Sequence, residues 1–290
     1  MPGLRAPTDY SQEPSRHPAL LVNSKEPFNA EPPRSSYVTP VEFFYKRNHG
    51  PVPIADDIEK CNVSMRCLVE NPKKLYMKDI LKLPKYVVTA TLQEDCHEQN
   101  SKGERSRVGH SAIGNAVWGG ARFADVLELV RILNFSHISQ SGGKHVEFVS
   151  IDRCKEENEG PCKSSIPLSM ATNPEADVLI AYEMNGETLN RDHGYPLRVI
   201  VPGVIGARSV KWLDSINIIA QESQGFFMQK DYKMFPPSVD WDNIDWSTRP
   251  QMDFPVQSAI CSLDDRNNVK PGKVDIAGMS SLKMGKSFGT

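Results

Sequence analysis

The sequence predicts an α+β fold, and three observations lead to this prediction. Short apolar stretches rich in branched residues, which are typical of strands, recur along the chain between proline and glycine. One segment, residues 121–133, has the spacing of an amphipathic helix. The two kinds of segment are mixed without a regular βαβ repeat, which favours α+β. At 290 residues and 39% hydrophobic composition, the chain can bury a sizeable core.

Residues 1–40 are rich in proline and polar residues and have no sustained hydrophobic period, so we expect an extended N-terminal arm. The main body is expected over residues 41–250, with a smaller unit over 251–290. The helix at 121–133 rests on Phe123, Val126, Leu127 and Val130, which fall on one face. A second, shorter helix is expected at 77–83. Strands are expected at 87–92 (buried), 146–151, 197–201, 210–220, 256–260 and 269–276.

Charge and hydropathy exclude several classes of partner. The chain has 34 basic and 36 acidic residues, a net charge of -2, so neither nucleic acid nor an anionic membrane is an expected partner. Its apolar runs are too short to span a bilayer, and residues 1–36 lack the apolar block of a signal peptide, which predicts an intracellular protein. Its six cysteines show no Cys-x-x-Cys pair, so we expect free thiols.

Three separate segments, 44–51, 190–198 and 206–212, combine arginine, lysine or histidine with glycine or proline. If such groups converge near tight turns, guanidinium forks and backbone N–H groups form a pocket for a dianion. The alternative for each segment alone is solvated surface charge. Because apolar strand-like residues flank the segments, the set together favours a pocket. We therefore predict that Arg47, His193, Arg198 and Lys211 line one cavity.

The same segments carry a family resemblance. Together with Ala-Tyr-Glu-Met-Asn-Gly at 181–186 and Val-Pro-Gly-Val-Ile-Gly-Ala-Arg at 201–208, they resemble the sulfite oxidase family. The resemblance extends from about residue 11 to 273 and is interrupted only between 93 and 111. Asp-Tyr-Lys-Met-Phe-Pro-Pro at 231–237 resembles the plant members in particular.

The resemblance implies a molybdopterin-binding oxidoreductase domain of mixed sheets and short helices, with molybdenum and molybdopterin as cofactors and no haem. The implied reaction oxidises sulfite to sulfate, with dioxygen as the electron acceptor. By resemblance, Arg47 and Tyr232 line the sulfite pocket and Trp118 forms its wall. The residues that would hold the pterin and its phosphate are Tyr45, Lys46, Arg47, Asn48, His49, Asp152, His193, Arg198, Ser209, Val210 and Lys211.

One departure from the family concerns the metal ligand. The family's thiolate directly follows a Leu-Gln strand end and precedes a small, arginine-containing run. Here Leu92-Gln93 is followed by Glu94, Asp95 and only then Cys96. Two extended residues span roughly 6 to 7 Å, whereas a metal–sulfur bond is about 2.3 Å, so Cys96 ligates molybdenum only if the loop coils back. The alternative is an exposed loop without a metal role, and we expect residues 94–110 to be irregular and exposed.

The second departure concerns the C-terminal part of the chain. Residues 269–274 resemble the start of the family's immunoglobulin-like domain, so 251–290 is interpreted as a remnant of it. The family is homodimeric through that domain, which also supplies an active-site arginine. Plant members are peroxisomal, so the resemblance implies that location. However, this chain ends in Phe-Gly-Thr and not in the peroxisomal tripeptide, and the alternative location is the cytoplasm.

The sequence thus predicts a sulfite-oxidising molybdenum enzyme whose activity is impaired by the altered ligand segment. Two alternatives remain open at this stage. One is the molybdenum domain of a nitrate reductase, which shares the fold and several motifs. The other is a cofactor-binding pseudoenzyme or non-functional isoform.

Overall fold

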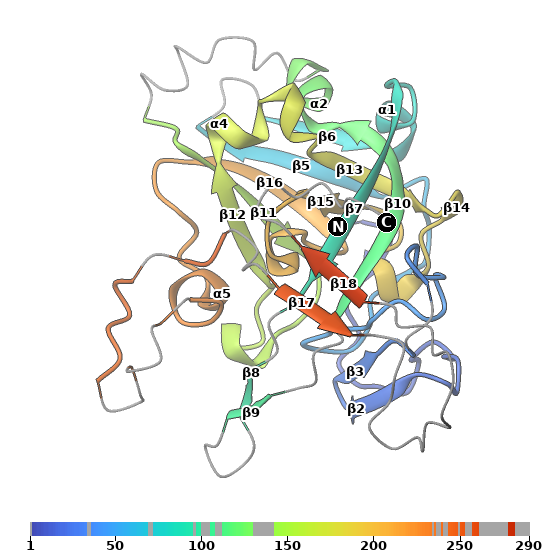
Figure 1. Ribbon diagram of the computed structural model, residues 1–290. Coiled ribbons are helices and arrows are strands. Elements are labelled where there is room, and N and C mark those ends of the chain that lie inside the picture. Colours follow the sequence, from blue (N-terminus) through green and yellow to red (C-terminus); the bar gives the residue numbers. More distant parts are fainter. Residues whose placement is uncertain are drawn as a thin grey trace, which may run out of the picture.

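A computed structural model describes residues 2–33, 36–68, 72–94, 97–99, 105–107, 112–129, 142–233, 235, 239, 243–248, 250–252, 257–260 and 278–281. Two five-stranded sheets and a few short helices make up the described body (Figure 1), which confirms the α+β prediction. No helix in these residues is both long and apolar enough to cross a membrane.

The first sheet is antiparallel, and its longest strand, β10, forms its centre. Its order is β14 (Glu187–Thr188), β13 (Leu179–Met184), β10 (Ile113–Arg122) and β7 (Lys85–Gln93), and β15 (Arg198–Ile200) also pairs with β13. Ala116 and Trp118 of β10 are fully buried in a core cluster that includes Phe44. This cluster supports one side of the site described below.

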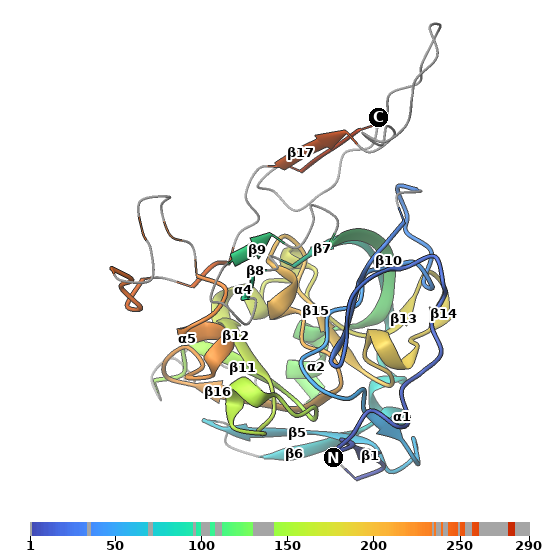
Figure 2. The ribbon, with the colours of Figure 1, turned by 90° about the horizontal axis from the view of Figure 1, so that it is seen from below.

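The second sheet has the order β12 (Lys163–Pro167), β11 (His145–Ser150), β16 (Leu213–Ile219), β5 (Asn62–Cys67) and β6 (Lys73–Tyr76). It contains the only parallel pair among the described strands, β16 with β5. Val146 and Phe148 of its strand β11 alternate with partly exposed residues, because one face of the sheet packs on the larger core cluster. Figure 2 shows β5 and β6 on one side of the body and β10 with β13 on another.

The helices are short. The predicted helix at 121–133 begins later, at Phe123, because Ala121 and Arg122 still pair with β13 as the end of β10. Val130 and the residues after it to 133 lie outside the described residues. The helices are α1 (Met77–Ile80), α2 (Phe123–Leu129), α4 (Leu168–Ala171) and α5 (Phe226–Gln229), with 3-10 turns η1 (Lys155–Glu157), η2 (Pro174–Ala176), η3 (Arg191–His193) and η4 (Gly206–Arg208).

Strand β7 differs from the buried strand predicted at 87–92. Val87 is 61% exposed, and only the last part of the strand, with Ala90, Leu92 and Gln93, is buried. The first half lies at the edge of the sheet, where one face meets solvent. The strand therefore leads the chain from the surface into the interior at Gln93.

The remaining strands form small pairs. The N-terminal segment contains β1 (Leu4–Arg5), which pairs with β4 (Ile54–Ala55), and a hairpin of β2 (Leu21–Lys25) and β3 (Phe28–Glu31). The segment expected to be irregular at 94–110 includes an antiparallel pair, β8 (His97–Gln99) with β9 (Arg105–Arg107), so that prediction is wrong there. Strand β17 (Gln257–Ile260) pairs with β18 (Gly278–Ser281), while the whole strand expected at 269–276 lies outside the described residues.

Candidate active site

A cavity lies where residues from both sheets meet, and it contains the predicted cationic cluster. Arg47, His193, Arg198 and Lys211 all line it, so the prediction that they converge is confirmed. Nine of the eleven expected pterin-binding residues are in its wall. The lining residues are Phe44, Tyr45, Arg47, His49, Glu94, Ser150, Asp152, Cys162, Lys163, Ser164, His193, Arg198, Gly206, Ala207, Ser209, Val210, Lys211, Trp212, Phe227 and Tyr232.

Arg198 is held rigidly at the start of β15. Its Nη1 donates to the His193 carbonyl at 3.2 Å, and its Nη2 donates to the Ser209 carbonyl at 2.9 Å. Its Nε has no hydrogen-bond partner among the described residues. Burial lowers the pKa of Arg198 to about 10, so the group is cationic at neutral pH. The guanidinium therefore offers an N–H donor that nothing described here satisfies.

Lys211 joins the three predicted segments. Its Nζ donates to the carbonyls of Arg47 (2.8 Å) and Asp192 (3.2 Å) and to Oδ1 of Asn48. Gly194, at φ +102°, makes room for Lys211: a Cβ there would lie 3.2 Å from the Lys211 Cβ. Burial lowers the pKa of Lys211 to about 7, while its three oxygen acceptors favour the ammonium form.

Two histidines of the wall are neutral. Burial, with the nearby charges of Arg47 and Lys211, lowers the pKa of His49 well below its usual value, and its ring packs on Phe227 at 4.3 Å between centroids. Burial also lowers the pKa of His193 well below its usual value, and Nε2 lies 3.0 Å from the Val41 carbonyl. Because a neutral imidazole bonded in this way carries its proton on Nε2, the other ring nitrogen of His193 is an acceptor.

Lys46 and Asn48 do not line the cavity. Lys46 points its Nζ at the carbonyls of Glu42 (2.6 Å) and Phe44 (2.8 Å), and burial lowers its pKa to about 8. The side chain of Asn48 accepts from Lys211, and its backbone N–H donates to Asn29 Oδ1 at 2.8 Å. Both residues brace the loop that carries Arg47.

Of the three residues expected at the substrate pocket, two line the cavity. Arg47 and Tyr232 are both in the wall. Trp118 is fully buried behind it: its ring lies 4.8 Å below the Arg198 guanidinium, and its Nε1 donates to the Ala90 carbonyl at 3.4 Å. The expectation that Trp118 forms the cavity wall is therefore wrong, because Arg198 stacks between the indole and the cavity.

Arg208 supports the Tyr232 side of the cavity from behind. It is completely buried, and it donates to the carbonyls of Phe227 (2.7 Å), Gln251 (3.0 Å) and Tyr232 (3.4 Å). Burial lowers its pKa to about 10. This residue belongs to a segment that the sequence singled out, but the structure assigns it to the frame of the site.

Glu94 is a cavity residue that sequence reasoning placed in an exposed loop. Its backbone N–H donates to the Ala112 carbonyl at 2.9 Å, which continues the pairing of β7 with the segment before β10. Its carboxylate Oε2 is buried although the residue as a whole is partly exposed, and burial raises the pKa of the carboxyl to about 7 against the opposing charges of Arg47 and Lys211 and a hydrogen bond with Tyr232. Its position directly after Leu92-Gln93 was the available sequence signal.

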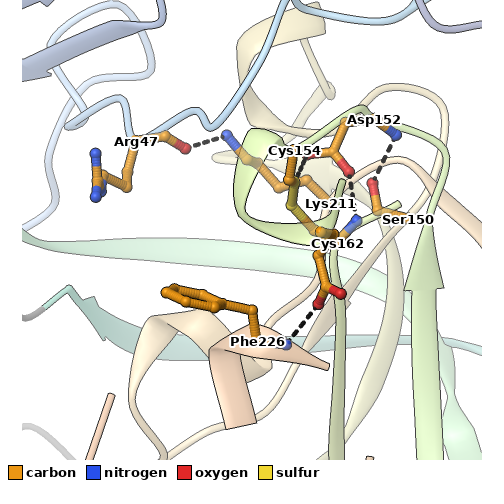
Figure 3. Close-up of a disulfide and its surroundings, with 8 residues drawn as sticks. Arg47, Ser150, Asp152, Cys154, Cys162, Lys211 and Phe226 are labelled. Carbon is orange, nitrogen blue, oxygen red and sulfur yellow. Dashed lines mark hydrogen bonds between the residues drawn. A yellow bond between two sulfur atoms is a disulfide. The ribbon is translucent and has the colours of Figure 1, made fainter. Parts of the chain in front are cut away.

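Asp152 lies beside a disulfide that was not expected. Cys154 and Cys162 are bonded, with 6.0 Å between their Cα atoms, which contradicts the prediction that all cysteines are thiols (Figure 3). The Cys162 N–H donates to Asp152 Oδ1 at 3.3 Å, and burial raises the pKa of Asp152. The two cysteines lie eight residues apart, and a turn at η1 brings them together, which spacing alone did not indicate.

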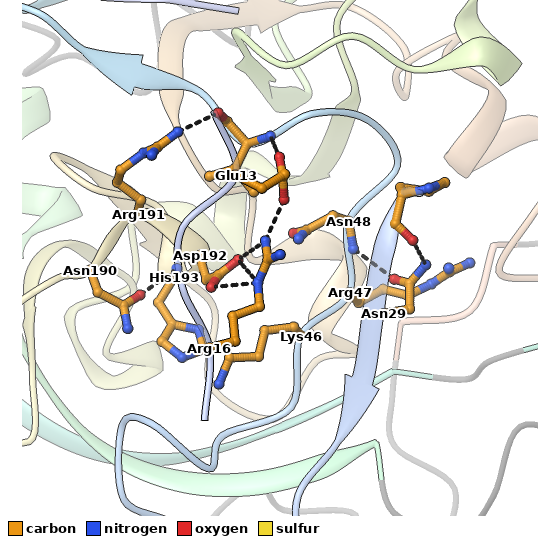
Figure 4. Close-up of polar contacts among 12 residues, drawn as sticks. Glu13, Arg16, Asn29, Lys46, Arg47, Asn48, Asn190, Arg191, Asp192 and His193 are labelled. Atoms are coloured by element: carbon orange, nitrogen blue, oxygen red, sulfur yellow. Dashed lines mark hydrogen bonds and ion pairs between the residues drawn. The ribbon is translucent and has the colours of Figure 1, made fainter. Parts of the chain in front are cut away.

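The N-terminal segment reaches the back of the site through Arg16. Its guanidinium donates to both carboxylate oxygens of Asp192, with Nη2 2.8 Å from Oδ1, and pairs also with Glu13 (Figure 4). Arg16 and Asp192 have side chains only 9% and 5% exposed. The bridge fixes η3, and thereby His193, from the surface side. Cys96, the expected metal ligand, lies outside the described residues.

Comparison with known proteins places this cavity in a family. Residues 49–227 match the family model described as the oxidoreductase molybdopterin binding domain. The chain is also 68% identical to sulfite oxidase of Arabidopsis thaliana over 288 residues, covering 96% of this chain and 73% of that protein. The chain belongs to the sulfite oxidase family of molybdenum oxidoreductases. The likeness to a plant member agrees with the interpretation of residues 231–237.

More distant relatives align with the chain to different extents. Mitochondrial sulfite oxidase of Rattus norvegicus is 42% identical over 96% of this chain, which spans about half (51%) of that protein. A nitrate reductase of Ulva prolifera is 36% identical over 78% of the chain and 27% of its own length. The solved structure of the sulfane dehydrogenase SoxCD from Paracoccus pantotrophus covers 94% of this chain and 64% of its own, with TM-score 0.68 and 20% identity, and so shares the fold.

Proposed function

We propose that this chain binds a molybdenum pyranopterin in the described cavity and oxidises sulfite to sulfate, at a much reduced rate. The observation that carries the proposal is the convergence of Arg47, Arg198 and Lys211 in one cavity of a sulfite oxidase family member. Dioxygen is proposed as the final electron acceptor, by resemblance to the plant members.

The donor set fits the anionic part of such a cofactor. Arg198 Nε is a buried N–H without a partner among the described residues. A buried donor left unsatisfied costs about 1 to 3 kcal/mol, so a phosphate or pterin oxygen bound there would remove that cost. Tyr45, Ser209 and Val210 complete the proposed pterin contacts.

When bound, the cofactor supplies the redox centre that accepts the electrons of sulfite. The residues of the chain supply binding and orientation. Arg47 offsets the negative charge of the incoming sulfite, and Tyr232, which lines the same cavity, contributes a hydroxyl. His49 and His193 are neutral, so they orient the ligand through hydrogen bonds and add no charge that would change with pH near neutrality.

The reduced rate follows from the ligand segment. The family's arginine-containing run is replaced by Glu94, Asp95 and Glu98, and like charges weaken the binding of an anion. Each well-placed donor that is lost costs about 3 kcal/mol, roughly a hundredfold in rate. Loss of the thiolate compounds this effect, and we expect turnover at least about a thousandfold below that of the Arabidopsis relative.

The test is sulfite-dependent oxygen consumption per bound molybdenum, with pterin content measured in the same sample. We expect the chain to retain pterin and to turn over slowly; turnover within about tenfold of the Arabidopsis relative would overturn the proposed impairment. Arg198→Met should lower the pterin content, whereas the control Arg122→Met, which removes an arginine stacked on Tyr86 outside the cavity, should not. Circular dichroism verifies that both variants are folded.

A second candidate function, nitrate reduction, is favoured only by the match to the nitrate reductase of Ulva prolifera, at 36% identity. The same preparation distinguishes the two, because nitrate can be offered with a reduced dye as the electron donor. Nitrate turnover without sulfite turnover would favour this alternative. A chain that carries pterin and performs neither reaction would be a cofactor-binding pseudoenzyme.

A further inference from the structure

Glu94 is the one described cavity residue whose buried carboxylate has an oxygen without a hydrogen-bond partner among the described residues. That oxygen is Oε2. The other cavity carboxylate, Asp152, accepts from the Cys162 N–H at 3.3 Å. A buried acceptor without a partner is costly, so such an atom in a native cavity calls for a partner such as a bound ligand, an ion or a water.

The side chain of Glu94 is fixed in this place. Its backbone is tied to Ala112 at the end of β7. Gly206 leaves the room that the carboxylate fills: a Cβ on Gly206 would lie 2.7 Å from Glu94 Oε1 and 3.0 Å from the Tyr45 hydroxyl. Tyr232 hydrogen-bonds to the carboxyl as well. Three segments distant in sequence therefore hold the group toward the cavity.

The neighbouring cations do not account for the bare oxygen. Arg198 directs its Nη atoms at the carbonyls of His193 and Ser209, and Lys211 directs Nζ at three other oxygens. Both act on Glu94 only through their charge, as does Arg47, which is the strongest of these opposing charges. A carboxylate oxygen left without a partner in the same cavity as Arg47, Arg198 and Lys211 is explained by a ligand that presents a cationic part to Glu94 and an anionic part to these cations. A metal held by an anionic cofactor has this charge pattern.

We propose that Glu94 ligates the molybdenum of the bound cofactor through its carboxylate oxygen Oε2, in place of a cysteine thiolate. This inference rests on the proposed function. It is favoured by the bare oxygen, by the fixed side chain and by the position of Glu94 directly after Leu92-Gln93. A carboxylate is a hard oxygen donor of the kind that small, highly charged metal ions accept.

The test uses the cofactor-loaded full chain and X-ray absorption at the molybdenum edge, which counts sulfur and oxygen neighbours without requiring turnover. We expect the sulfur shell of the wild-type chain to come from the pterin dithiolene alone. Cys96→Ser is the matched control and should leave the spectrum unchanged. Glu94→Cys should add one sulfur neighbour, because it places a thiolate at the end of β7.

A second measurement is the ratio of bound molybdenum to pterin. It tests the assignment even in variants whose absorption spectra change. Glu94→Ala should lower this ratio at least about tenfold at unchanged pterin content, because the molybdenum loses the protein ligand proposed for it. Loss of a sulfur neighbour in Cys96→Ser would make Cys96 the ligand and overturn the assignment, while the proposed function would stand. A wild-type chain with pterin and no molybdenum would also overturn the assignment. A chain with neither would overturn the proposed function with it.

Discussion

The two walls of the cavity differ in how their charges are compensated. On the wall of Arg198 and Lys211, almost every donor meets a backbone carbonyl or side-chain oxygen at 2.5 to 3.2 Å. On the wall of Glu94, a buried carboxyl keeps one bare oxygen, and burial raises its pKa to about 7. The charged atoms of the first wall therefore have hydrogen-bond partners without a ligand, except Arg198 Nε. The carboxylate of the second wall does not have a partner for Oε2.

This difference separates structural from functional charge. Lys211 joins three segments of the chain, so its ammonium stabilises the fold as well as attracting an anion. The Glu94 carboxyl bonds Tyr232, but its buried Oε2 makes the ionised form energetically unfavourable without a ligand. We therefore expect mutations in the wall of Arg198 and Lys211 to lower the free energy of unfolding. At the wall of Glu94, we expect the free energy of unfolding to depend on pH and on ligand binding.

The largest effect is expected for Lys211→Met. The substitution leaves the carbonyls of Arg47 and Asp192 and the Asn48 amide oxygen without their donor, and we expect a loss of about 3 to 5 kcal/mol in the free energy of unfolding. The measurement is urea unfolding. Lys85→Met, which removes a half-exposed ion pair with Glu183, is the control and should cost less than about 1 kcal/mol. Equal losses in both variants would show that Lys211 is not a structural centre.

A smaller effect is expected for Glu94→Gln in the cofactor-free chain. This variant should become more stable relative to wild type as the pH rises. The pKa of the folded state, about 7, lies above the ordinary value of 4.5, so the folded chain binds more protons than the unfolded chain between these values. The contribution of Glu94 to stability is therefore present below about pH 4.5 and is lost as pH rises through 7. Relative to wild type, the variant should gain about 2 to 3 kcal/mol between about pH 5 and pH 8.

Denaturant unfolding at both pH values measures this gain. Glu187→Gln, which changes an exposed residue of β14, is the control, because its carboxyl stays hydrated when the chain folds. A relative stability of Glu94→Gln that does not change with pH would contradict the burial of Glu94 in a low-dielectric cavity.

The smallest effect is expected for Gly206→Ala, which tests the contact between η4 and Glu94. A Cβ at this position meets Glu94 Oε1 at 2.7 Å, so the substitution should cost about 1 to 3 kcal/mol. In a Glu94→Ala background the cost should fall by about 1 kcal/mol, a coupling that a double-mutant cycle measures. The Gln93 carbonyl and the Tyr45 hydroxyl, both 3.0 Å from the added carbon, remain in either background. If the effects of the two substitutions were fully additive, the Glu94 side chain would not contact position 206, which would contradict the structure.

By itself the sequence determined the fold class, most strands and the convergence of the cationic groups. The branched residues of β11, β15 and β16 follow local patterns that hold in any strand packed on a core, so they can be read one segment at a time. The pocket was predictable because Arg47, Arg198 and Lys211 each sit beside a glycine or proline turn flanked by apolar residues. The helix after β10 was found, with its start two residues too early.

Only the tertiary structure decided the burial of Glu94, the place of Trp118 and the bond between Cys154 and Cys162. An acidic residue in a polar stretch is exposed by default, and what buries Glu94 is the meeting of Tyr45, Gly206 and Tyr232, which lie far apart in sequence. Trp118 lies outside the wall because Arg198, eighty residues later, covers it. Local patterns record which residues lie on the same face of an element, but contacts between distant segments decide which polar groups lose water.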